Sequence, residues 1–481
     1  MHKSVLVRYL RAFEPRDWRE LRKLVASPFF NQREDVRQLL TYLEKPIRQN
    51  QLDRLDKHVV FRRLFPKRPF HEATLRHCRS FLLQLVKQYL IQNELPREQP
   101  QQQLLLARAL HQRGLVQYAE RELRKARQEL ERSPWRHGHF HFQRYQIAQE
   151  ELALTLLQKR SGLVNFQSVS ESLTLAYIAD LLRHSCSLLM QRSMSTTAHS
   201  SQLREAVLRL IDESDYREVP AVGLYWRIYQ ALHYQEEGQP ERSEAAFERA
   251  KLLLEQHWSR FPPQEIREIY LFTINYCIRR LNQGEFRFVR EAFELFRSGL
   301  EKQTLLHRGY QSSFSYKNIT RLGMALGEDE WVAYFLEQYK AQLPPRERDN
   351  TWRYNLAFFY FQQPDYARAM PLLQQVELKD TLNNLDARRM LLRSYYELRA
   401  YDALDSLLDS FSAYIYRQKD MGYHRDNYLN LIRFVKRMIH LEQNDREAWD
   451  QLREELLLTA QVAEREWLTK EITKHRKNSW S

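Results

Sequence analysis

The chain has 481 residues, of which only 11 are glycine and 43% are hydrophobic. Glycine at about 2%, against an average of about 7%, argues against nucleotide-binding α/β enzymes, because their folds need glycine where the backbone approaches phosphate. The formal net charge is +14, and residues 1–100 hold 21 basic and 11 acidic side chains, a net charge of +10. This basic end favours contact with nucleic acid, an anionic membrane surface or an acidic protein. The alternative is simply a well-solvated, arginine-rich surface.

Residues 1–97 are predicted to form an N-terminal basic helical module. A helix is expected from Glu72 onward, because apolar residues recur there at three- and four-residue spacing, at Leu75, Cys78, Leu82, Leu85, Val86 and Tyr89. Upstream, Asn31 is the expected N-cap of another helix, with Glu34 in the capping-box position. Nothing in this module resembles a repeat.

Two polar segments interrupt the helical pattern. The first, residues 95–103, contains two prolines, and we place a domain boundary near residue 98, so that residues 98–481 form the second domain. The second, residues 193–201, is predicted to be a long loop between two helices.

The second domain repeats a helix-turn-helix unit. Around Gly114, small residues at Ala107 and Ala119 alternate with larger ones, so that two antiparallel helices can approach closely. Two later copies align without a gap and lie 35 residues apart; their matching positions are Leu356, Ala357, Tyr360, Tyr366, Ala369, Leu373 and Val376, then Leu391, Leu392, Tyr395, Tyr401, Leu404, Leu408 and Phe411. Looser copies surround Gly238 and Gly284. This order of residues resembles the tetratricopeptide repeat (TPR) over residues 100–460, with residues 135–220 and the final helices departing from it. The resemblance implies an all-α protein, an α-solenoid of helix hairpins.

Motifs for catalysis or cofactor binding are missing from the sequence. Gly323 and Gly327 are followed by Glu328 where a phosphate-binding loop needs lysine, and His71-Glu72 has Leu75 where a zinc protease needs its second histidine. We therefore expect no enzyme activity and no cofactor. Three closely spaced histidines, His137, His139 and His141, are the best metal candidates, but no carboxylate or cysteine accompanies them. Histidines exposed at a helix start are the favoured alternative, and no metal site is predicted.

A cytoplasmic location is expected. The three cysteines, Cys78, Cys186 and Cys277, are far apart and lie in apolar helical patterns, which indicates buried thiols and not disulfides. The sequence shows neither a secretion signal at Met1 nor a stretch of about 18 apolar residues that could span a membrane.

The repeat register predicts a ligand groove on the first helices of two neighbouring units. Its expected partner contacts are three aromatic residues of one unit and two arginines and a tyrosine of the next: Tyr354, Phe358, Phe361, Arg389, Arg393 and Tyr396. Aromatic faces beside an arginine pair can cover an apolar side chain and hold a carboxylate or phosphate. Alternatively, the aromatics pack internally and the arginines pair with Glu397 or other nearby acids. The TPR clamp for chaperone tails is absent, since Phe358 and Arg393 stand where the resemblance requires asparagine.

A second surface could bind anions or nucleic acid. It comprises the basic residues Lys57, Arg62, Arg63, Lys67 and Arg68, which alternate with Phe61, Phe65 and Phe70. Such a mixture can bind phosphates and stack on bases, although phenylalanines at this spacing also suit a core.

From the repeat pattern and the predicted groove, we expect a non-enzymatic intracellular scaffold that binds a protein or peptide on the concave face of the solenoid. The alternative is a nucleic-acid-binding regulator that uses the basic module.

Overall fold

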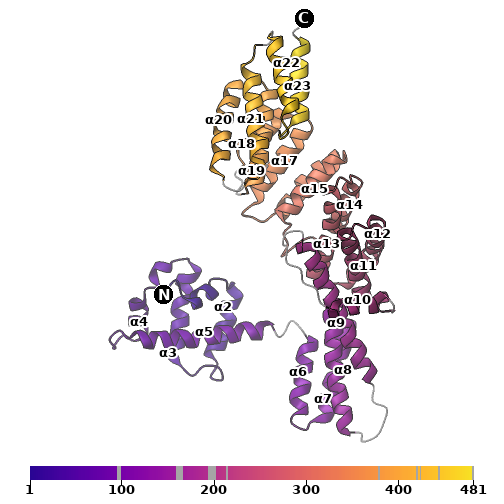
Figure 1. The fold of residues 1–481 in the computed structure, drawn as a ribbon. Helices are drawn as coiled ribbons and strands as arrows, with labels where there is room; N and C mark the ends of the chain where they lie inside the picture. Colours follow the sequence, from indigo (N-terminus) through magenta and orange to yellow (C-terminus); the bar gives the residue numbers. More distant parts are fainter. Residues whose placement is uncertain are drawn as a thin grey trace. The chain divides into compact units, whose positions relative to one another are not determined.

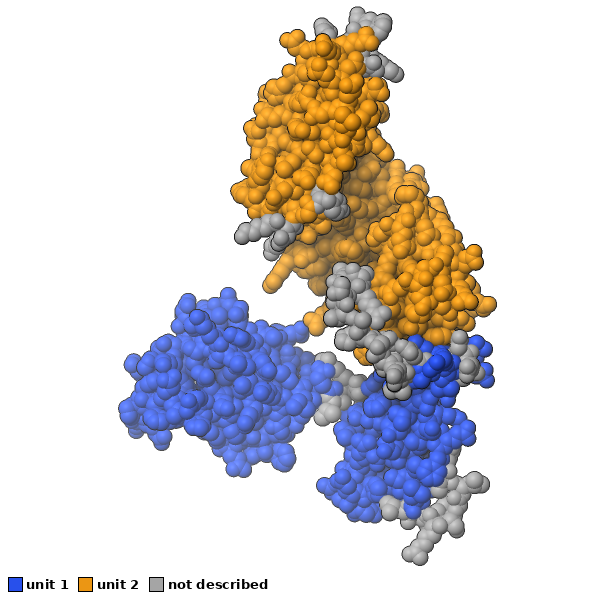
Figure 2. Space-filling view, in the orientation of Figure 1, with its two compact units in different colours: residues 1–181, 202–222 blue, residues 182–201, 223–481 orange. Residues whose placement is uncertain are grey.

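The computed structural model describes residues 1–94, 99–158, 166–192, 202–212, 215–376, 380–418, 421–422, 424–442 and 445–478. Every regular element in these ranges is a helix, and the one β-bridge there joins His307 to Tyr310 (Figure 1). The predicted all-α fold is confirmed. The chain divides into two compact units, residues 1–181 with 202–222 and residues 182–201 with 223–481 (Figure 2). The boundary predicted near residue 98 and the loop predicted at 193–201 lie outside the described residues.

The basic module, defined from here on as residues 1–94, has its own hydrophobic core. Its helices are α1 (Val5–Leu10), α2 (Pro15–Ala26), α3 (Glu34–Arg48), the 3₁₀ turn η1 (Leu52–Arg54), α4 (Lys57–Leu64) and α5 (Glu72–Glu94). The apolar stripe predicted for α5 is confirmed, since all six of its residues are buried. Burying such a stripe against other helices is what stabilises amphipathic helices of this length in a protein.

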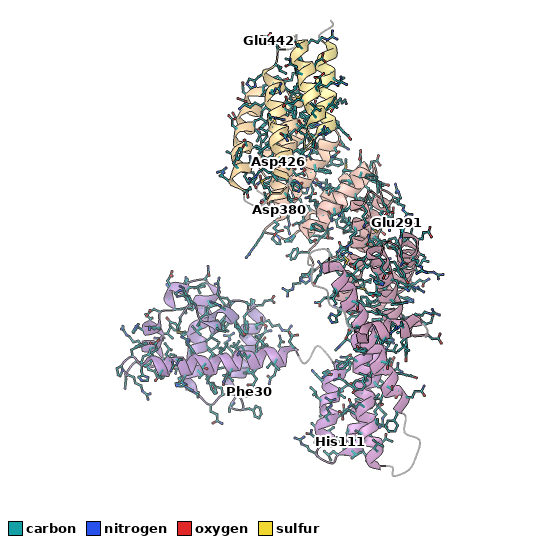
Figure 3. The ribbon with its side chains drawn as sticks, viewed as in Figure 1. Phe30, His111, Glu291, Asp380, Asp426 and Glu442 are labelled. Atoms are coloured by element: carbon teal, nitrogen blue, oxygen red, sulfur yellow. The ribbon has the colours of Figure 1, made fainter. Side chains whose placement is uncertain are left out.

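The predicted start of α3 is wrong. The helix begins at Glu34 with Arg33 as its N-cap, and no side chain makes the capping hydrogen bond. Asn31 is instead buried in the connection between α2 and α3, where its side-chain amide donates to the carbonyl oxygens of Val25 and Arg33, at 2.9 and 3.1 Å. Its side-chain oxygen accepts from the Arg33 backbone N–H at 3.0 Å. Phe30, labelled in Figure 3, packs partly against the core beside it. Asn31 therefore stabilises a turn and is not available as a cap.

Helices also fill the remaining described residues. They are α6 (Gln99–His111), α7 (Val116–Arg132), α8 (Gly138–Gln158), α9 (Phe166–Arg192), α10 (Gln202–Asp212), α11 (Pro220–Glu236), α12 (Pro240–His257), α13 (Pro263–Asn282), α14 (Phe288–Glu301), α15 (Ser313–Ala325), α16 (Asp329–Gln338), α17 (Arg348–Gln362), α18 (Tyr366–Gln374), α19 (Thr381–Glu397), α20 (Tyr401–Arg417), α21 (His424–His440), α22 (Arg446–Leu458) and α23 (Arg465–Asn478), with the 3₁₀ turns η3 (Asp215–Glu218), η4 (Trp258–Arg260) and η5 (Lys340–Gln342). The polar interruption predicted to reach residue 103 is shorter than expected, because α6 starts at Gln99. Pro100 lies in its first turn, where a helix does not need the missing N–H.

Six helix hairpins of the described chain share one turn geometry. They are α6/α7, α11/α12, α13/α14, α15/α16, α17/α18 and α19/α20, and each turn contains a residue with positive φ, namely Gly114, Gly238, Gly284, Gly327, Pro364 and Arg399. In all six, the next residue donates its backbone N–H to the carbonyl five residues before it, at 2.9 to 3.1 Å. This is the Schellman ending of a helix. The last two turns, at Pro364 and Arg399, are 35 residues apart, the spacing of the two copies in the sequence.

The helices of a hairpin approach each other through small buried residues. Seven positions before the turn residue, five of these six hairpins carry a small residue that is at most 3% exposed, namely Ala107, Ala231, Cys277, Thr320 and Ala357, and the sixth carries the buried Leu392. Gly323 is the extreme case, because a Cβ atom there would lie 2.4 Å from Cγ2 of Val332 on the partner helix. In the second unit, α14 packs on α15 and α18 on α19, and the first helices α15, α17 and α19 contact one another in chain order. No described helix has the length and hydropathy needed to cross a membrane.

Candidate functional site

The residues of the predicted groove come together in the second unit, but most of their surface is covered. Tyr354, Phe358 and Phe361 on α17 are 3%, 7% and 5% exposed. On α19, Tyr396 is 5% exposed, while the Arg389 and Arg393 side chains retain 14% and 26% of their exposure. Internal packing therefore leaves little of the surface of these six residues for a partner to contact.

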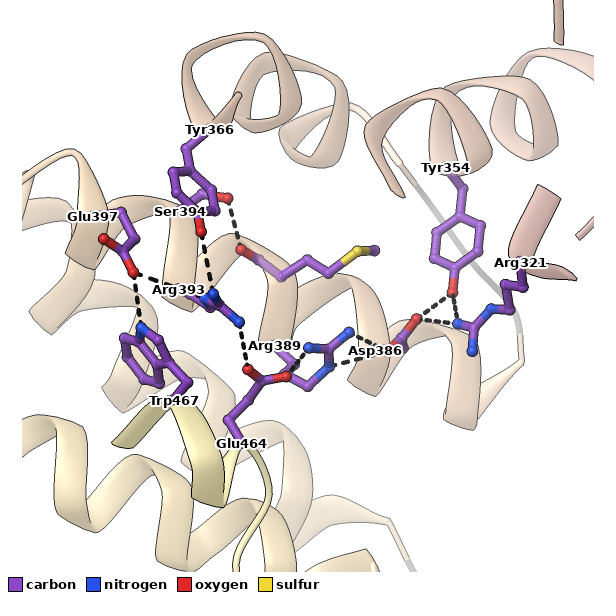
Figure 4. A network of polar contacts seen from close by, with 11 residues as sticks. Arg321, Tyr354, Tyr366, Asp386, Arg389, Arg393, Ser394, Glu397, Glu464 and Trp467 are labelled. Atoms are coloured by element: carbon purple, nitrogen blue, oxygen red, sulfur yellow. Dashed lines mark hydrogen bonds and ion pairs between the residues drawn. The ribbon is translucent and has the colours of Figure 1, made fainter. Parts of the chain in front are cut away.

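Asp386 on α19 is the centre of a polar network that we call the Asp386 network: Arg321, Tyr354, Asp386, Arg389, Arg393 and Glu464 (Figure 4). Its carboxylate accepts hydrogen bonds from Arg321 at 2.6 Å, from Arg389 at 2.9 Å and from the Tyr354 hydroxyl. Burial alone would raise the pKa of Asp386, but the charges of Arg389 and Arg321 hold this pKa below its ordinary value. Asp386 is therefore ionised and fully paired at neutral pH.

The arginine pair already holds a carboxylate, and that carboxylate belongs to the chain itself. Glu464, the residue before α23, accepts hydrogen bonds from Arg389 and, at 2.9 Å, from Arg393. The Trp467 ring, one turn further along α23, lies 5.5 Å from the Arg393 guanidinium, and its indole N–H donates to Glu397 at 2.8 Å. These are the contacts of the internal-packing alternative. Partner binding by these residues stays an untested prediction.

Side chains from α15 reach across α17 to α19. The Arg321 guanidinium lies 5.0 Å from the centre of the Phe358 ring while it bonds to Asp386, and Lys317 donates to the side chain of Asn383. Phe358 is thereby covered from the side on which the groove was expected. Sequence reasoning could have found Arg321, because it stands six residues before Gly327, as Phe358 does before Pro364. No sequence signal placed Glu464 or Trp467 here.

On the basic module, the predicted phenylalanines mostly belong to the core. Phe61 is 2% exposed and Phe65 is half-buried, while Phe70 is 36% exposed and packs on the His58 ring with 4.0 Å between centroids. Stacking of bases on Phe61 is therefore excluded. Lys57 is also engaged, since its ammonium lies 3.4 Å from the carboxylate of Glu72.

Four of the predicted cations remain exposed: Arg62, Arg63, Lys67 and Arg68. Across the described ranges none of the four forms an ion pair, although Arg68 lies over the Phe65 ring at 5.9 Å. Like charges that gather without local acids give a surface its positive potential.

The structure also places Arg63, a predicted cation, beside other cations that the sequence did not indicate. A surface hollow between α3, η1 and α4 is lined by Glu34, Arg37, Gln38, Thr41, Tyr42, Lys45, Pro46, Arg54, Arg63 and Leu64, and we call it the basic hollow. Arg37, Lys45, Arg54 and Arg63 are exposed, whereas Pro46 and Leu64 are buried and Tyr42 is half-buried. The hollow thus combines cations that reach solvent with an apolar floor.

Pairing of charge within the basic hollow is incomplete. Glu34 is its one lining acid, and its carboxylate lies 3.7 Å from Arg37. Among the described residues, the side chains of Lys45, Arg54 and Arg63 have no ion pair or hydrogen bond. The Tyr42 hydroxyl donates to the backbone oxygen of Arg54 at 3.0 Å, which fixes the ring beside these cations. Arg37 and Lys45, eight residues apart on α3, were missed because their shared surface is visible only once η1 and α4 are placed.

His141 and the three cysteines are buried. The expectation that His137, His139 and His141 are exposed is wrong for His141, which is only 5% exposed; burial lowers its pKa to about 4, so it is neutral at physiological pH. No group of three His, Cys, Asp or Glu in the described part of the chain could hold a metal ion. All three cysteines are buried and free, and burial raises the pKa of Cys78 to about 12, which keeps that thiol protonated.

In comparisons with known proteins, no family model and no curated protein match this sequence. What the structure itself defines is an all-α protein in which antiparallel helix hairpins follow a basic helical module.

Proposed function

We propose that this protein is a non-enzymatic binding protein whose basic module holds nucleic acid, and whose helix hairpins form a TPR-like scaffold. The shared Schellman turn, the small buried residues before it in five of the six hairpins and the contacts between successive first helices support the TPR-like arrangement. They do not indicate what the protein binds, and that part of the proposal depends on charge.

The single observation that supports nucleic acid as the ligand is the exposed, unpaired positive charge of the module. Several acidic side chains of the module already form ion pairs: Glu20 pairs with Arg19 and Lys23, Asp35 with Arg33, and Glu44 with Arg22 and Arg48. Around α4, by contrast, Arg62, Arg63 and Lys67 face solvent without an acid among the described residues. Cations of this kind displace counterions from a phosphate backbone, and this release drives sequence-independent binding.

The test is the fluorescence anisotropy of a labelled oligonucleotide with the full chain at increasing salt. We expect binding that weakens steeply with salt, because each phosphate contact releases counterions. Reversing the charge of Arg62, Arg63, Lys67 and Arg68 together should weaken this binding strongly. A matched control reverses four exposed cations elsewhere in the module, Arg8, Arg11, Arg16 and Arg76, and should retain most of the affinity. Equal loss in both variants would show only a net-charge effect and contradict the proposal.

A protein partner on the hairpins is the second candidate. One observation favours it: the arginine pair of α19 does bind a carboxylate beside an aromatic ring, here Glu464 and Trp467. A partner at this position would have to displace the start of α23. In that case Arg389→Glu with Arg393→Glu should remove the partner in a pull-down while hydrogen exchange of the α19 amides stays slow. If exchange in α19 becomes fast, the pair is needed for the fold.

A further inference from the structure

We propose that the basic hollow binds single-stranded nucleic acid, with the phosphate backbone on its exposed cations and a base on its floor against Tyr42. This inference rests on the proposed function and adds to it the binding residues and the strandedness of the ligand. According to this inference, the principal contacts are Lys45, Arg54 and Arg63, and not Arg62, Lys67 and Arg68.

Charge complementarity supports an anionic occupant. Lys45, Arg54 and Arg63 come from three successive elements, α3, η1 and α4, and line one hollow. They have no ion pair among the described residues, and the one lining acid, Glu34, pairs with Arg37. Like charges in a concave site repel one another and focus their potential on the space between them. A phosphate placed there relieves that repulsion.

The apolar floor distinguishes single strands from other anions. Pro46 and Leu64 are buried, and the half-buried Tyr42 ring beside them is fixed through its hydroxyl, which donates to the Arg54 backbone at 3.0 Å. An unpaired base offers a flat apolar face to such a ring, and stacking of this kind holds single strands in other proteins. A duplex keeps its bases stacked inside and presents mainly phosphate to a protein surface, so it would leave this floor unused.

Polar side chains of α3, which is in direct contact with α4, complete the lining of the hollow. Thr41 and Gln38, both exposed on α3, add a hydroxyl and an amide that can donate hydrogen bonds to phosphate or base edges.

The experiment compares two triple variants of the full chain that change the net charge equally. The hollow variant carries Lys45→Glu, Arg54→Glu and Arg63→Glu, and the surface variant carries Arg62→Glu, Lys67→Glu and Arg68→Glu. Binding of a labelled single-stranded oligonucleotide, of its duplex, of polyglutamate and of phosphatidylserine vesicles is measured for each, with circular dichroism to confirm folding.

We expect the hollow variant to bind the single strand roughly tenfold or more weakly than the surface variant does. Its plot of log K against log salt should also be less steep than that of the parent chain, by about 2. The parent chain should prefer the single strand over its duplex, over polyglutamate and over vesicles. If the surface variant loses more affinity than the hollow variant, or if the duplex binds as well as the single strand, the inference is wrong while the proposed function stands. If no nucleic acid binds, both are wrong; preferred binding of vesicles or polyglutamate would identify the other class of partner.

Substitutions of Tyr42 test the floor without changing charge. Tyr42→Leu keeps an apolar side chain but removes the aromatic face, and affinity for the single strand should fall about tenfold. Tyr42→Phe keeps the face and loses only the hydroxyl, so it should bind like the parent chain. If the two variants bind equally, the ring does not stack on a base.

Discussion

The Asp386 network and the basic hollow contain the same kinds of residue, arginines beside a tyrosine, in opposite environments. In the network, Arg389 keeps 14% of its side-chain exposure and pairs with both Asp386 and Glu464. In the hollow, Arg54 and Arg63 are exposed, and their side chains have no partner among the described residues. Buried charge must be paired because desolvation is costly, whereas exposed charge can stay unpaired at little cost. The comparison therefore separates arginines that stabilise the fold from arginines available to a ligand.

The largest effect is expected when the network loses its central acid. Asp386→Ala leaves Arg321 and Arg389 facing each other with part of their charge uncompensated, and removing one partner of a buried pair typically costs about 3–5 kcal/mol. Those amides of α19 that exchange slowly in the parent chain should exchange fast in this variant. Asp409→Ala is the matched control, because Asp409 also pairs with a cation, Lys436 at 2.9 Å, but is 69% exposed. Similar exchange in the two variants would show that burial does not distinguish these ion pairs.

Acid should weaken the network by a smaller amount. The folded pKa of Asp386 is depressed below its unfolded value, so its contribution to stability is present above the unfolded pKa and is lost as pH falls through the folded pKa. Protection of α19, corrected for intrinsic exchange rates, should stay constant from pH 7 to about 5 and decline below about 4. In Asp386→Asn this decline should be smaller. A decline of equal size in that variant would assign the acid sensitivity to other carboxylates.

The smallest effect on stability is expected in the basic hollow. Changing Lys45, Arg54 and Arg63 together to alanine should shift the free energy of unfolding of the module by about 0.5 kcal/mol or less, because exposed side chains without partners contribute little. The shift should be neutral or stabilising, since mutual repulsion is relieved. Thermal unfolding followed by circular dichroism measures it. A loss of about 2 kcal/mol or more would mean that these cations hold the module together.

Local patterns predicted the helices well, because helical periodicity reports directly which face is buried. The stripe from Leu75 to Tyr89 is buried as expected, and the small residues Ala107 and Ala119 do lie between two helices. The cap at Asn31 was wrong, because the same residue type also stabilises turns through its side chain, and only the structure shows that Val25 and Arg33 are its partners.

The candidate sites were less predictable, because their partners are distant in sequence. Tyr354 and the arginines of α19 lie in one polar network, but the carboxylate that Arg393 binds lies 71 residues further along the chain. The basic hollow has the same difficulty. Arg63 was predicted from a local run of charge, whereas Lys45 and Arg54 join it only because η1 and α4 fold back on α3.

The contacts from α15 to α19 have a consequence for how this part of the chain unfolds. In a helical-repeat array each unit contacts only its immediate neighbours, so the coupling between units is local. Here Arg321 binds Asp386, and Lys317 binds Asn383, across the intervening α17. Excising residues 348–376 would remove Tyr354 from between these partners and change the spacing that lets them meet. We therefore expect the three hairpins from α15 to α20 to unfold as one cooperative segment.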